Sequence, residues 1–304
     1  MLNLSVIILT YNEEIDIRRC IENVQQISDE IFIVDSYSTV NTIEIAKTLG
    51  AKVYQNKWEQ NHAKQFNWAL ANLPIKTKWV LRLDADEYLM PELAVELNEK
   101  LSSVPKDVSG IIFKRRHIFF NKWIKKGTYP VKLLRLFQFE KAICEQRLMD
   151  EHIRLLEGKS VEFEHDFVDH NLNNISWWTN KHIGYAVREA TDLLNLEFGL
   201  FASERDAIYE GKIGEQASAK RAKKNSYARK PLFIRSFAYF IYRYIFKFGF
   251  TEGKEGFLWH FLQGWWYRTL VDAKIFEIKK ACGNDRQNII IYLRENYNID
   301  CNNL

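Results

Sequence analysis

The sequence predicts an α/β fold with a mostly parallel central sheet and helices on its flanks. Short, almost continuously apolar runs, of the kind buried on both faces of a sheet, recur at residues 4–12, 30–35 and 78–83. Stretches with helical spacing separate these runs, as at residues 15–24 and 62–73. Strands and helices that alternate in this way form right-handed βαβ units with a parallel sheet.

Local signals place the other elements of the first half. Gly50 stands where a helix C-cap glycine belongs, which predicts a helix over residues 40–49. A short strand is expected directly after it, at residues 51–54. Proline is favoured in the first turn of a helix, so the next helix is expected at residues 91–101, which begin with Pro91.

The pattern changes after residue 110, but no linker rich in glycine or proline marks the change. Strand-like runs are expected at residues 111–113, 133–137 and 161–165, and a long helix at 174–194. We therefore predict one domain over residues 1–216, with halves at 1–105 and 106–216. Beyond it, a basic run at 220–230 precedes two apolar, aromatic stretches, and residues 217–304 are predicted to form amphipathic helices.

Acids and hydroxyl-bearing residues gather where three of the predicted strands end. These residues are Thr10, Tyr11 and Asn12, then Asp35, Ser36 and Ser38, then Asp84 and Asp86. Ligands of open α/β sheets bind outside this edge. Two carboxylates at i and i+2 favour a hard cation, which completes its shell with water or phosphate oxygens. An acidic turn that simply leaves the strand for solvent is the alternative, but three converging strand ends favour a metal–nucleotide site.

Composition and charge give information about the partners and cellular location of the protein, and less about its function. A formal net charge of +4 over 304 residues gives no reason to expect a polyanionic partner. The four cysteines are scattered without metal-ligand spacing, which is typical of reduced cytosolic thiols. No signal-peptide pattern is found at the N-terminus, and we expect a cytoplasmic protein.

Three motifs resemble the family 2 glycosyltransferases, which have the GT-A fold. They are Ser5–Glu14, Ile33–Thr39 and Leu83–Glu87, and the similarity covers most of the chain. Residues 249–256 resemble the branch that builds bacterial lipopolysaccharide core, capsule or exopolysaccharide. The chain departs from the family at Val40-Asn41, where an acid commonly follows the second motif.

The resemblance implies an inverting enzyme that moves a sugar from a nucleotide diphosphate, in our interpretation a UDP-sugar, to an acceptor hydroxyl. It implies Mn²⁺ or Mg²⁺ bound by Asp86, with Asp84 nearer the ribose and metal. Asp35 and Thr10 are expected to face the nucleotide base. The candidate nucleotide-sugar-binding residues are Thr10, Asn12, Glu13, Asp35, Ser36, Lys64, Asp84 and Ala85.

The resemblance also implies a histidine at the metal or diphosphate and a carboxylate as general base. His170, just before the long helix, matches the place of the histidine, and His165 is the alternative. Glu151, in an acidic turn, is the preferred base, with Asp150 beside it as the other candidate.

Several basic residues have two interpretations each. Lys64 or Gln65, at the start of a predicted helix, contacts donor phosphate or uracil, unless Lys64 is a solvated surface lysine. Arg135 and Lys132 either steady the diphosphate or an anionic acceptor, or form a basic face across neighbouring strands.

Two other classes of function compete with a glycosyltransferase. A nucleotidyltransferase usually carries a glycine-rich, basic signature after its first strand, but residues 10–14 contain no glycine. A non-catalytic protein could bind nucleic acid or membrane through its tail, but the tail aromatics lie in apolar helices and not on a strand platform. We therefore expect an enzyme with a glycan or lipid-linked acceptor, no nucleic-acid partner, and an oligomeric state left open.

The tail is predicted to lie on a membrane surface and not to cross it. Arg235, Tyr239, Arg243 and Lys247 recur every four residues and form one stripe, which is predicted to stay in water while the aromatics enter the headgroup region. A spanning helix would carry three of these cations into hydrocarbon. Residues 218–270 would hold the protein at the cytoplasmic face of the inner membrane. Packing on the catalytic domain or on a second subunit is the alternative.

Overall fold

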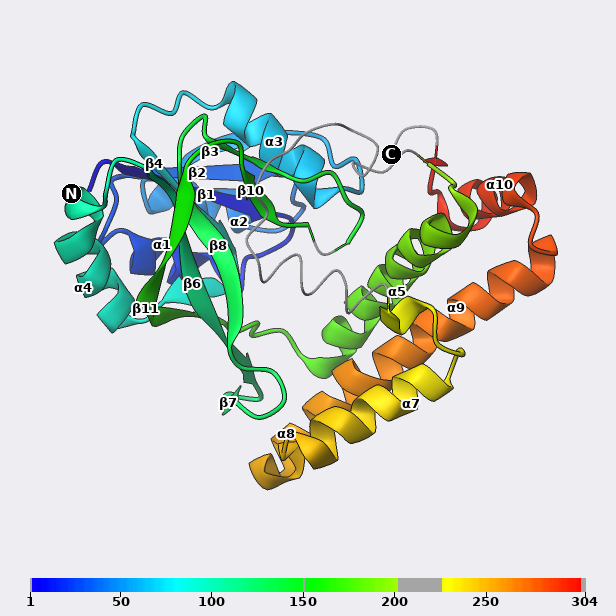
Figure 1. The fold of residues 1–304 in the computed structure, drawn as a ribbon. Helices are drawn as coiled ribbons and strands as arrows, with labels where there is room; N and C mark the ends of the chain where they lie inside the picture. Colours follow the sequence, from blue (N-terminus) through cyan, green and yellow to red (C-terminus); the bar gives the residue numbers. More distant parts are fainter. Residues whose placement is uncertain (1, 150, 202–225, 302–304) are drawn as a thin grey trace.

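The computed structural model describes residues 2–149, 151–201 and 226–301. Figure 1 shows a curled sheet with helices around it, and long helices from the C-terminal part that extend to one side. The predicted α/β class is confirmed. All four cysteines are buried and free.

The first half forms the parallel part of the sheet. Its strands are β1 (Leu4–Thr10), β2 (Glu30–Asp35), β3 (Lys52–Gln55) and β4 (Trp79–Asp84), in the spatial order β3-β2-β1-β4. The crossover helices are α1 (Ile17–Val24), α2 (Thr42–Thr48) and α3 (His62–Asn72). Because β1, β2 and β4 are buried almost throughout, their sequences are nearly continuous apolar runs. All four strands point their carboxyl ends to one edge.

The second half extends this sheet in the order β4-β8-β6-β11-β5. Its elements are β5 (Glu87–Leu89), α4 (Pro91–Lys100), η1 (Leu101–Ser103), β6 (Val108–Phe119), β7 (Lys122–Ile124), β8 (Val131–Gln138), β9 (Ala142–Cys144), β10 (Ile153–Leu155) and β11 (Lys159–Asp169). Strand β8 is antiparallel to both neighbours, whereas β6 and β11 are parallel. Strand β5 pairs with the end of β11, so that Asp169 lies opposite Glu87. This pairing brings the end of β11 to the acidic turn after β4.

The C-terminal part is helical. Its elements are α5 (Ile175–Phe198), α7 (Ile234–Ile241), η2 (Tyr242–Phe246), η3 (Gly249–Glu252), α8 (Gly253–Trp259), η4 (His260–Trp266), α9 (Tyr267–Cys282) and α10 (Arg286–Tyr297). Helix α5 packs along α9, and Ala190 and Leu194 share a hydrophobic core with Val271 and Ile275. A smaller cluster, in which Trp259 packs against strand residues of the sheet, joins this module to β6 and β7.

The polar stripe on α7 and η2 faces the protein, and the prediction that it stays in water is wrong. Arg235 and Arg243 are each 3% exposed. Arg235 Nε donates to Asp272 Oδ1 on α9 at 2.7 Å, and Arg243 donates to the side chain of Gln263. A buried carboxylate on α9 thus compensates the Arg235 charge, and the aromatic side of the helix is left outside. Lys247 alone of the three cations is exposed.

No helix in the described parts of the chain is long and apolar enough to cross a membrane. Three sequence predictions involve residues outside the described ones. They are Asp150, the domain boundary between residues 216 and 217, and the basic run at 220–230, of which residues 226–230 are described.

Candidate active site

The carboxyl edge of the parallel strands brings Thr10 and Asp35 together. The two residues lie opposite each other at the ends of β1 and β2, and the Thr10 hydroxyl donates to Asp35 Oδ2 at 2.9 Å. The backbone N–H of Ser38 donates to Asp35 Oδ1 at 2.7 Å. Asp35 is fully buried. Its carboxylate therefore has a fixed position at the floor of this edge.

The loop after β1 is bonded to the loop after β2. Asn12 has a left-handed backbone, with φ of 56°. Its N–H donates to Ser38 Oγ at 2.8 Å, and its side-chain oxygen accepts from the Thr39 N–H at 2.8 Å. The backbone N–H of Asn41, where the chain departs from the family motif, donates to Glu14 Oε2 at 3.2 Å. These bonds give the two loops one joint conformation.

The start of α3 presents Gln65 to this edge. Gln65 is 2% exposed, and its Nε2 donates to Ser36 Oγ at 3.1 Å. The Lys64 ammonium lies 3.6 Å from Glu59, whose side chain is 65% exposed. Gln65, one of the two alternatives, is therefore in hydrogen-bond contact with the predicted nucleotide pocket.

Asp84 and Asp86 lie at the turn between β4 and β5, with the buried Ala85 between them. Burial alone would raise the pKa of Asp84, but the guanidinium groups of Arg135 and Arg82, 3.4 and 3.9 Å away, lower it to about 2. The Asp84 side chain is 44% exposed. It is therefore an accessible carboxylate at neutral pH.

Asp86 lies among like charges. Burial raises its pKa, and the nearby carboxylates of Asp169 and Asp84 raise it further. The side-chain amide of Asn171 donates to Asp86 Oδ2 at 3.0 Å. Because several carboxylates share this small volume, an added cation would relieve their mutual repulsion.

Glu151 is held by a buried arginine. Arg82 Nη2 donates to Glu151 Oε1 at 2.8 Å, and the same nitrogen is 3.9 Å from Asp84. Burial would raise the pKa of Glu151, but Arg82 and His62 outweigh it and lower the pKa. The structure thus places Glu151 beside the acid pair as an ionised carboxylate. Its neighbour Asp150 lies outside the described residues.

The two histidines lie in different surroundings. The His170 backbone N–H donates to Asp86 O at 3.0 Å, while its ring nitrogens contact Arg19 at 3.2 Å and Asn121 at 3.1 Å. His165 instead lies 2.9 Å from Glu96 on α4. Within the described residues, no group of three or more histidine, cysteine or acidic side chains is arranged to hold a metal ion. His170 is next to the acid pair, and its ring points to Arg19 and Asn121.

The basic residues of the second half separate into two groups. Arg135 belongs to the site, because its Nη2 donates to the buried Glu87 at 2.6 Å as well as to Asp84. Lys132 forms an ion pair with Glu162 on β11 at 2.5 Å. The interpretation of Lys132 as part of a cross-strand basic face fits this contact.

Sequence reasoning missed three cations of the site: Arg82, Arg19 and Lys181. Arg82 carried a usable signal, since a charge inside a buried apolar strand needs a partner. Arg19 forms an ion pair with Asp16, with 2.8 Å between Nη2 and Oδ1, and also contacts His170. Lys181, on α5, is near enough to Asp86 for that carboxylate to raise its pKa. Nothing local in the sequence marks these last two, because their partners lie far away along the chain.

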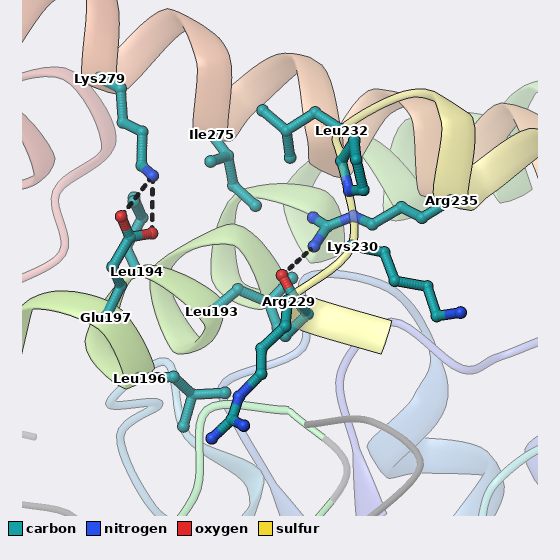
Figure 2. Close-up of a pocket in the computed structure, with 12 residues that line it drawn as sticks. Leu193, Leu194, Leu196, Glu197, Arg229, Lys230, Leu232, Arg235, Ile275 and Lys279 are labelled. Atoms are coloured by element: carbon teal, nitrogen blue, oxygen red, sulfur yellow. Dashed lines mark hydrogen bonds and ion pairs between the residues drawn. The ribbon is translucent and has the colours of Figure 1, made fainter. Parts of the chain in front are cut away.

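A cavity of about 610 Å³ lies elsewhere, between α5, α7 and α9. Figure 2 shows that leucines of α5 and the basic side chains Arg229, Lys230, Arg235 and Lys279 surround it. Two of these cations already have partners: Lys279 pairs with Glu197, and Arg235 with Asp272. The cavity lacks the paired acids of the sheet edge, which is the stronger candidate for catalysis.

The fold and the site define a class of enzyme domain in which a parallel α/β sheet presents a buried aspartate and an acid pair at its carboxyl edge. Residues 5–154 match the family model described as Glycosyl transferase family 2. The chain therefore carries a family 2 glycosyltransferase domain. This match and the observed sheet agree with the GT-A fold that the motifs implied.

Known proteins similar to this chain include glycosyltransferases of Rickettsia species. An uncharacterized glycosyltransferase of Rickettsia typhi is 32% identical over 163 residues, which are 54% of this chain and 49% of that protein. One from Rickettsia prowazekii is 38% identical over 107 residues, 35% of this chain and 36% of that protein. The chain thus spans about half, or less, of the length of these curated relatives.

Among solved structures, glucosyl-3-phosphoglycerate synthase from Mycobacterium tuberculosis, in complex with Mn²⁺, uridine diphosphate and glucosyl-3-phosphoglycerate, is similar over a limited region. It is 21% identical, with a TM-score of 0.31, and the match covers 38% of this chain and 43% of that one.

Proposed function

We propose that this protein transfers a sugar from a nucleotide diphosphate to an acceptor hydroxyl, with a UDP-sugar as the donor. The observation that carries the proposal is the acid pair Asp84–Asp86 at the same sheet edge as the buried Asp35. A buried carboxylate is a suitable partner for a uracil N–H, and an acid pair suits a cation bound to diphosphate. The family match over residues 5–154 supports the same reaction class.

The residues present fit a divalent cation, Mn²⁺ or Mg²⁺. Hard cations take carboxylate oxygens, and Asp84 and Asp86 offer them on one turn where like charges repel. Asp86 and the exposed Asp84 would hold the ion. When bound, it would neutralise charge on the leaving diphosphate. The backbone of His170 adjoins this turn, and its ring would need to leave Arg19 to become a ligand.

The chain's own residues supply the base for an inverting displacement. In the proposed step the acceptor oxygen bonds to the anomeric carbon, the bond from that carbon to the diphosphate oxygen breaks, and the acceptor proton passes to a carboxylate. Glu151, ionised and fixed by Arg82, is the proposed proton acceptor. Asp150 is the alternative base.

The exposed side of the C-terminal module favours a membrane surface as a further partner. Large apolar side chains on α7 to α8, here called the aromatic patch, are at least 42% exposed: Phe233, Ile234, Phe237, Tyr242, Ile245, Phe246, Phe248, Phe250 and Phe257. Apolar surface of this extent on one module marks an interaction site. Exposed lysines lie on the same and adjoining segments: Lys125, Lys126, Lys247 and Lys254.

Glu252 joins two of these lysines to the patch. Its Oε1 accepts from the backbone N–H groups of Lys125 and Lys126, at 2.7 and 3.1 Å. Aromatic side chains flanked by lysine suit the interface of an anionic bilayer. We therefore propose peripheral binding at the cytoplasmic face of the inner membrane and a lipid-linked or polysaccharide acceptor in cell-envelope glycan synthesis.

The donor reaction is tested by incubating the protein with a panel of nucleotide sugars and Mn²⁺ and measuring release of the nucleoside diphosphate. Slow release of UDP from one UDP-sugar, lost when EDTA is added, is the expected result. Formation of a nucleotide sugar and pyrophosphate from UTP and a sugar 1-phosphate would instead identify a nucleotidyltransferase. No hydrolysis of any donor, together with no binding of any nucleotide, would contradict the proposal.

A further inference from the structure

One face of α5 carries alternating aromatic and cationic side chains. Trp177, Lys181, Tyr185 and Arg188 are spaced four, four and three residues apart, so they lie on one face of the helix. The Lys181 ammonium lies 4.4 Å from the centre of the Trp177 ring and 5.9 Å from that of Tyr185. The Arg188 guanidinium lies 5.8 Å from the Tyr185 ring.

This face is anchored to the active site at its first end. Just before α5, the Asn171 side chain donates to Asp86 at 3.0 Å, and the Leu172 N–H donates to Asp16 at 3.4 Å. Asn174 then caps the helix by accepting from the Trp177 N–H at 3.0 Å. The chain therefore leaves the acid pair and enters α5 directly.

The other end of the face reaches the loop between β3 and α3. Arg188 lies 5.8 Å from the ring of Trp58, which follows β3. Lys181 is seven residues earlier, about 10 Å along the helix at 1.5 Å per residue. Lys181 thus lies between the acid pair and the contact at Trp58.

Lys181 is a cation near several acids but bonded to none. Among the described residues it forms no hydrogen bond or ion pair, and the aromatic rings are its close contacts. Burial would lower its pKa, but Tyr185, Asp86 and Glu13 outweigh this and raise it. Glu13 Oε2 is likewise buried without a hydrogen-bond partner.

A purely structural counter-ion would be expected to bond its carboxylates directly, because charged groups in a partly buried site gain most from direct contact. Lys181 instead lies on ring faces, close enough to Asp86 and Asp84 for their charges to raise its pKa. An anion that binds a cation held by Asp84 and Asp86 would also be attracted to the Lys181 ammonium. A diphosphate carries enough negative charge to interact with both the cation and the ammonium.

We propose that Lys181 binds the diphosphate of the donor, so that α5 completes a site that residues 5–154 form only in part. This inference rests on the proposed function. As the bond to the sugar breaks, negative charge develops on the leaving phosphate oxygen, and a fixed ammonium stabilises that charge. Lys181 lies outside the region matched by the family model.

The test is calorimetric titration of the full chain with UDP, UMP and uridine, in EDTA and in Mg²⁺. Lys181→Met is expected to weaken UDP binding about tenfold in both conditions, on the scale of one charge-assisted hydrogen bond, and to leave uridine binding unchanged. Lys181→Arg should keep most of the UDP affinity. The matched control is Lys279→Met, which removes a lysine that pairs with Glu197 at the far end of α5.

Uridine binding shows that each variant is folded. If Lys181→Met also loses uridine, Lys181→Gln carries the same comparison. If the wild-type protein binds both ligands, this inference alone would be overturned when Lys181→Met and Lys181→Gln both weaken UDP and uridine equally, or when neither weakens UDP. A wild-type protein that binds neither ligand would overturn the proposed function and this inference with it.

Discussion

The guanidinium of Arg82 bonds the carboxylate of Glu151, with 2.8 Å between Nη2 and Oε1, and their side chains are 6% and 13% exposed. The same nitrogen lies 3.9 Å from Asp84 Oδ1. A buried ion pair contributes little net stability, but losing one partner leaves a costly unpaired charge. Arg82 therefore fixes the proposed base at a set place beside the acid pair.

Asp86→Ala should abolish transfer while the protein stays folded. Asp86 lies on the turn after β4, outside the packed strand, and its loss removes a carboxylate from the proposed cation site. We expect the rate to fall about a hundredfold or more, on the scale of removing one strong electrostatic contact in a transition state. Steady-state turnover with the preferred donor measures this, and circular dichroism monitors the fold.

Glu92→Ala is the matched control for Asp86→Ala, because Glu92 is an exposed acid in the first turn of α4. It should leave the rate within twofold of wild type, since exposed substitutions away from a site have small effects, about 0.5 kcal/mol. Near-normal turnover of a folded Asp86→Ala protein would contradict the metal assignment.

Glu151→Gln should lower kcat with little change in donor affinity. A general base acts in the transition state and not in donor recognition, so the loss belongs to kcat. Kinetics at saturating acceptor and calorimetric UDP binding separate the two effects. If Asp150→Asn is the severe change and Glu151→Gln is mild, the base is Asp150. If both variants turn over normally, the acidic turn has no catalytic part.

Acidification should destabilise the C-terminal module through His260. This ring is fully buried, and burial together with the Arg243 guanidinium lowers its pKa to about 4. As the pH falls, this histidine takes up its proton at a higher pH in the unfolded chain than in the folded one. The free energy of unfolding therefore keeps its full value above about pH 6.5 and falls toward pH 4, by up to about 3 kcal/mol. Urea unfolding between pH 7 and 4 measures this loss.

His260→Leu is the comparison for this pH dependence. It removes the titrating ring while His182, whose pKa is also lowered to about 4 by burial, remains. The variant should be less stable at pH 7, since the ring packs closely against Gly249. Its stability should nevertheless fall less steeply with acid than that of the wild type. Equal slopes for both proteins would exclude His260 as a source of the acid sensitivity.

The fold of the first half could be predicted because its signals are local. Strands β1, β2 and β4 are buried on both faces, so each reads as an apolar run, and their polar ends converge because parallel strands share one carboxyl edge. The pattern alone therefore predicts that Thr10, Asp35 and Asp84 lie at one edge of the sheet. It does not predict the place of Lys181, because this depends on how α5 packs near residues that are far away along the chain, such as Asp86 and Glu13.

The C-terminal stripe shows a limit of periodicity. A repeat of four residues identifies Arg235, Tyr239 and Arg243 as one face of a helix, but it does not say which face is solvated. The deciding residue is Asp272 on α9, which accepts from Arg235 at 2.7 Å. Because Asp272 is far from Arg235 along the chain, the sequence does not reveal this pairing, and periodicity alone predicts a solvated charged face.

Burial of the charged stripe leaves the aromatic side of the C-terminal helices exposed, and we expect this side to bind membranes. With Arg235 and Arg243 buried, the aromatic patch is free to enter a bilayer interface without carrying these charges into it. Full-length protein should sediment with anionic liposomes at low salt and less at high salt, because the flanking lysines contribute through screened attraction. The double variant Ile234→Glu/Phe246→Glu, which alters side chains 67% and 68% exposed, should stay in the supernatant.

Val95→Glu is the control for that variant, since Val95 is a 54% exposed apolar residue on α4, and it should sediment like wild type. Light scattering without lipid tests the alternative occupant of the patch, a second copy of the chain. A dimer that the double variant dissociates, with no liposome binding by the wild type, would replace the membrane by a subunit interface. Sedimentation of the double variant to the wild-type extent would show that the patch does not bind lipid, because two new carboxylates in an anionic interface must weaken any contact made there.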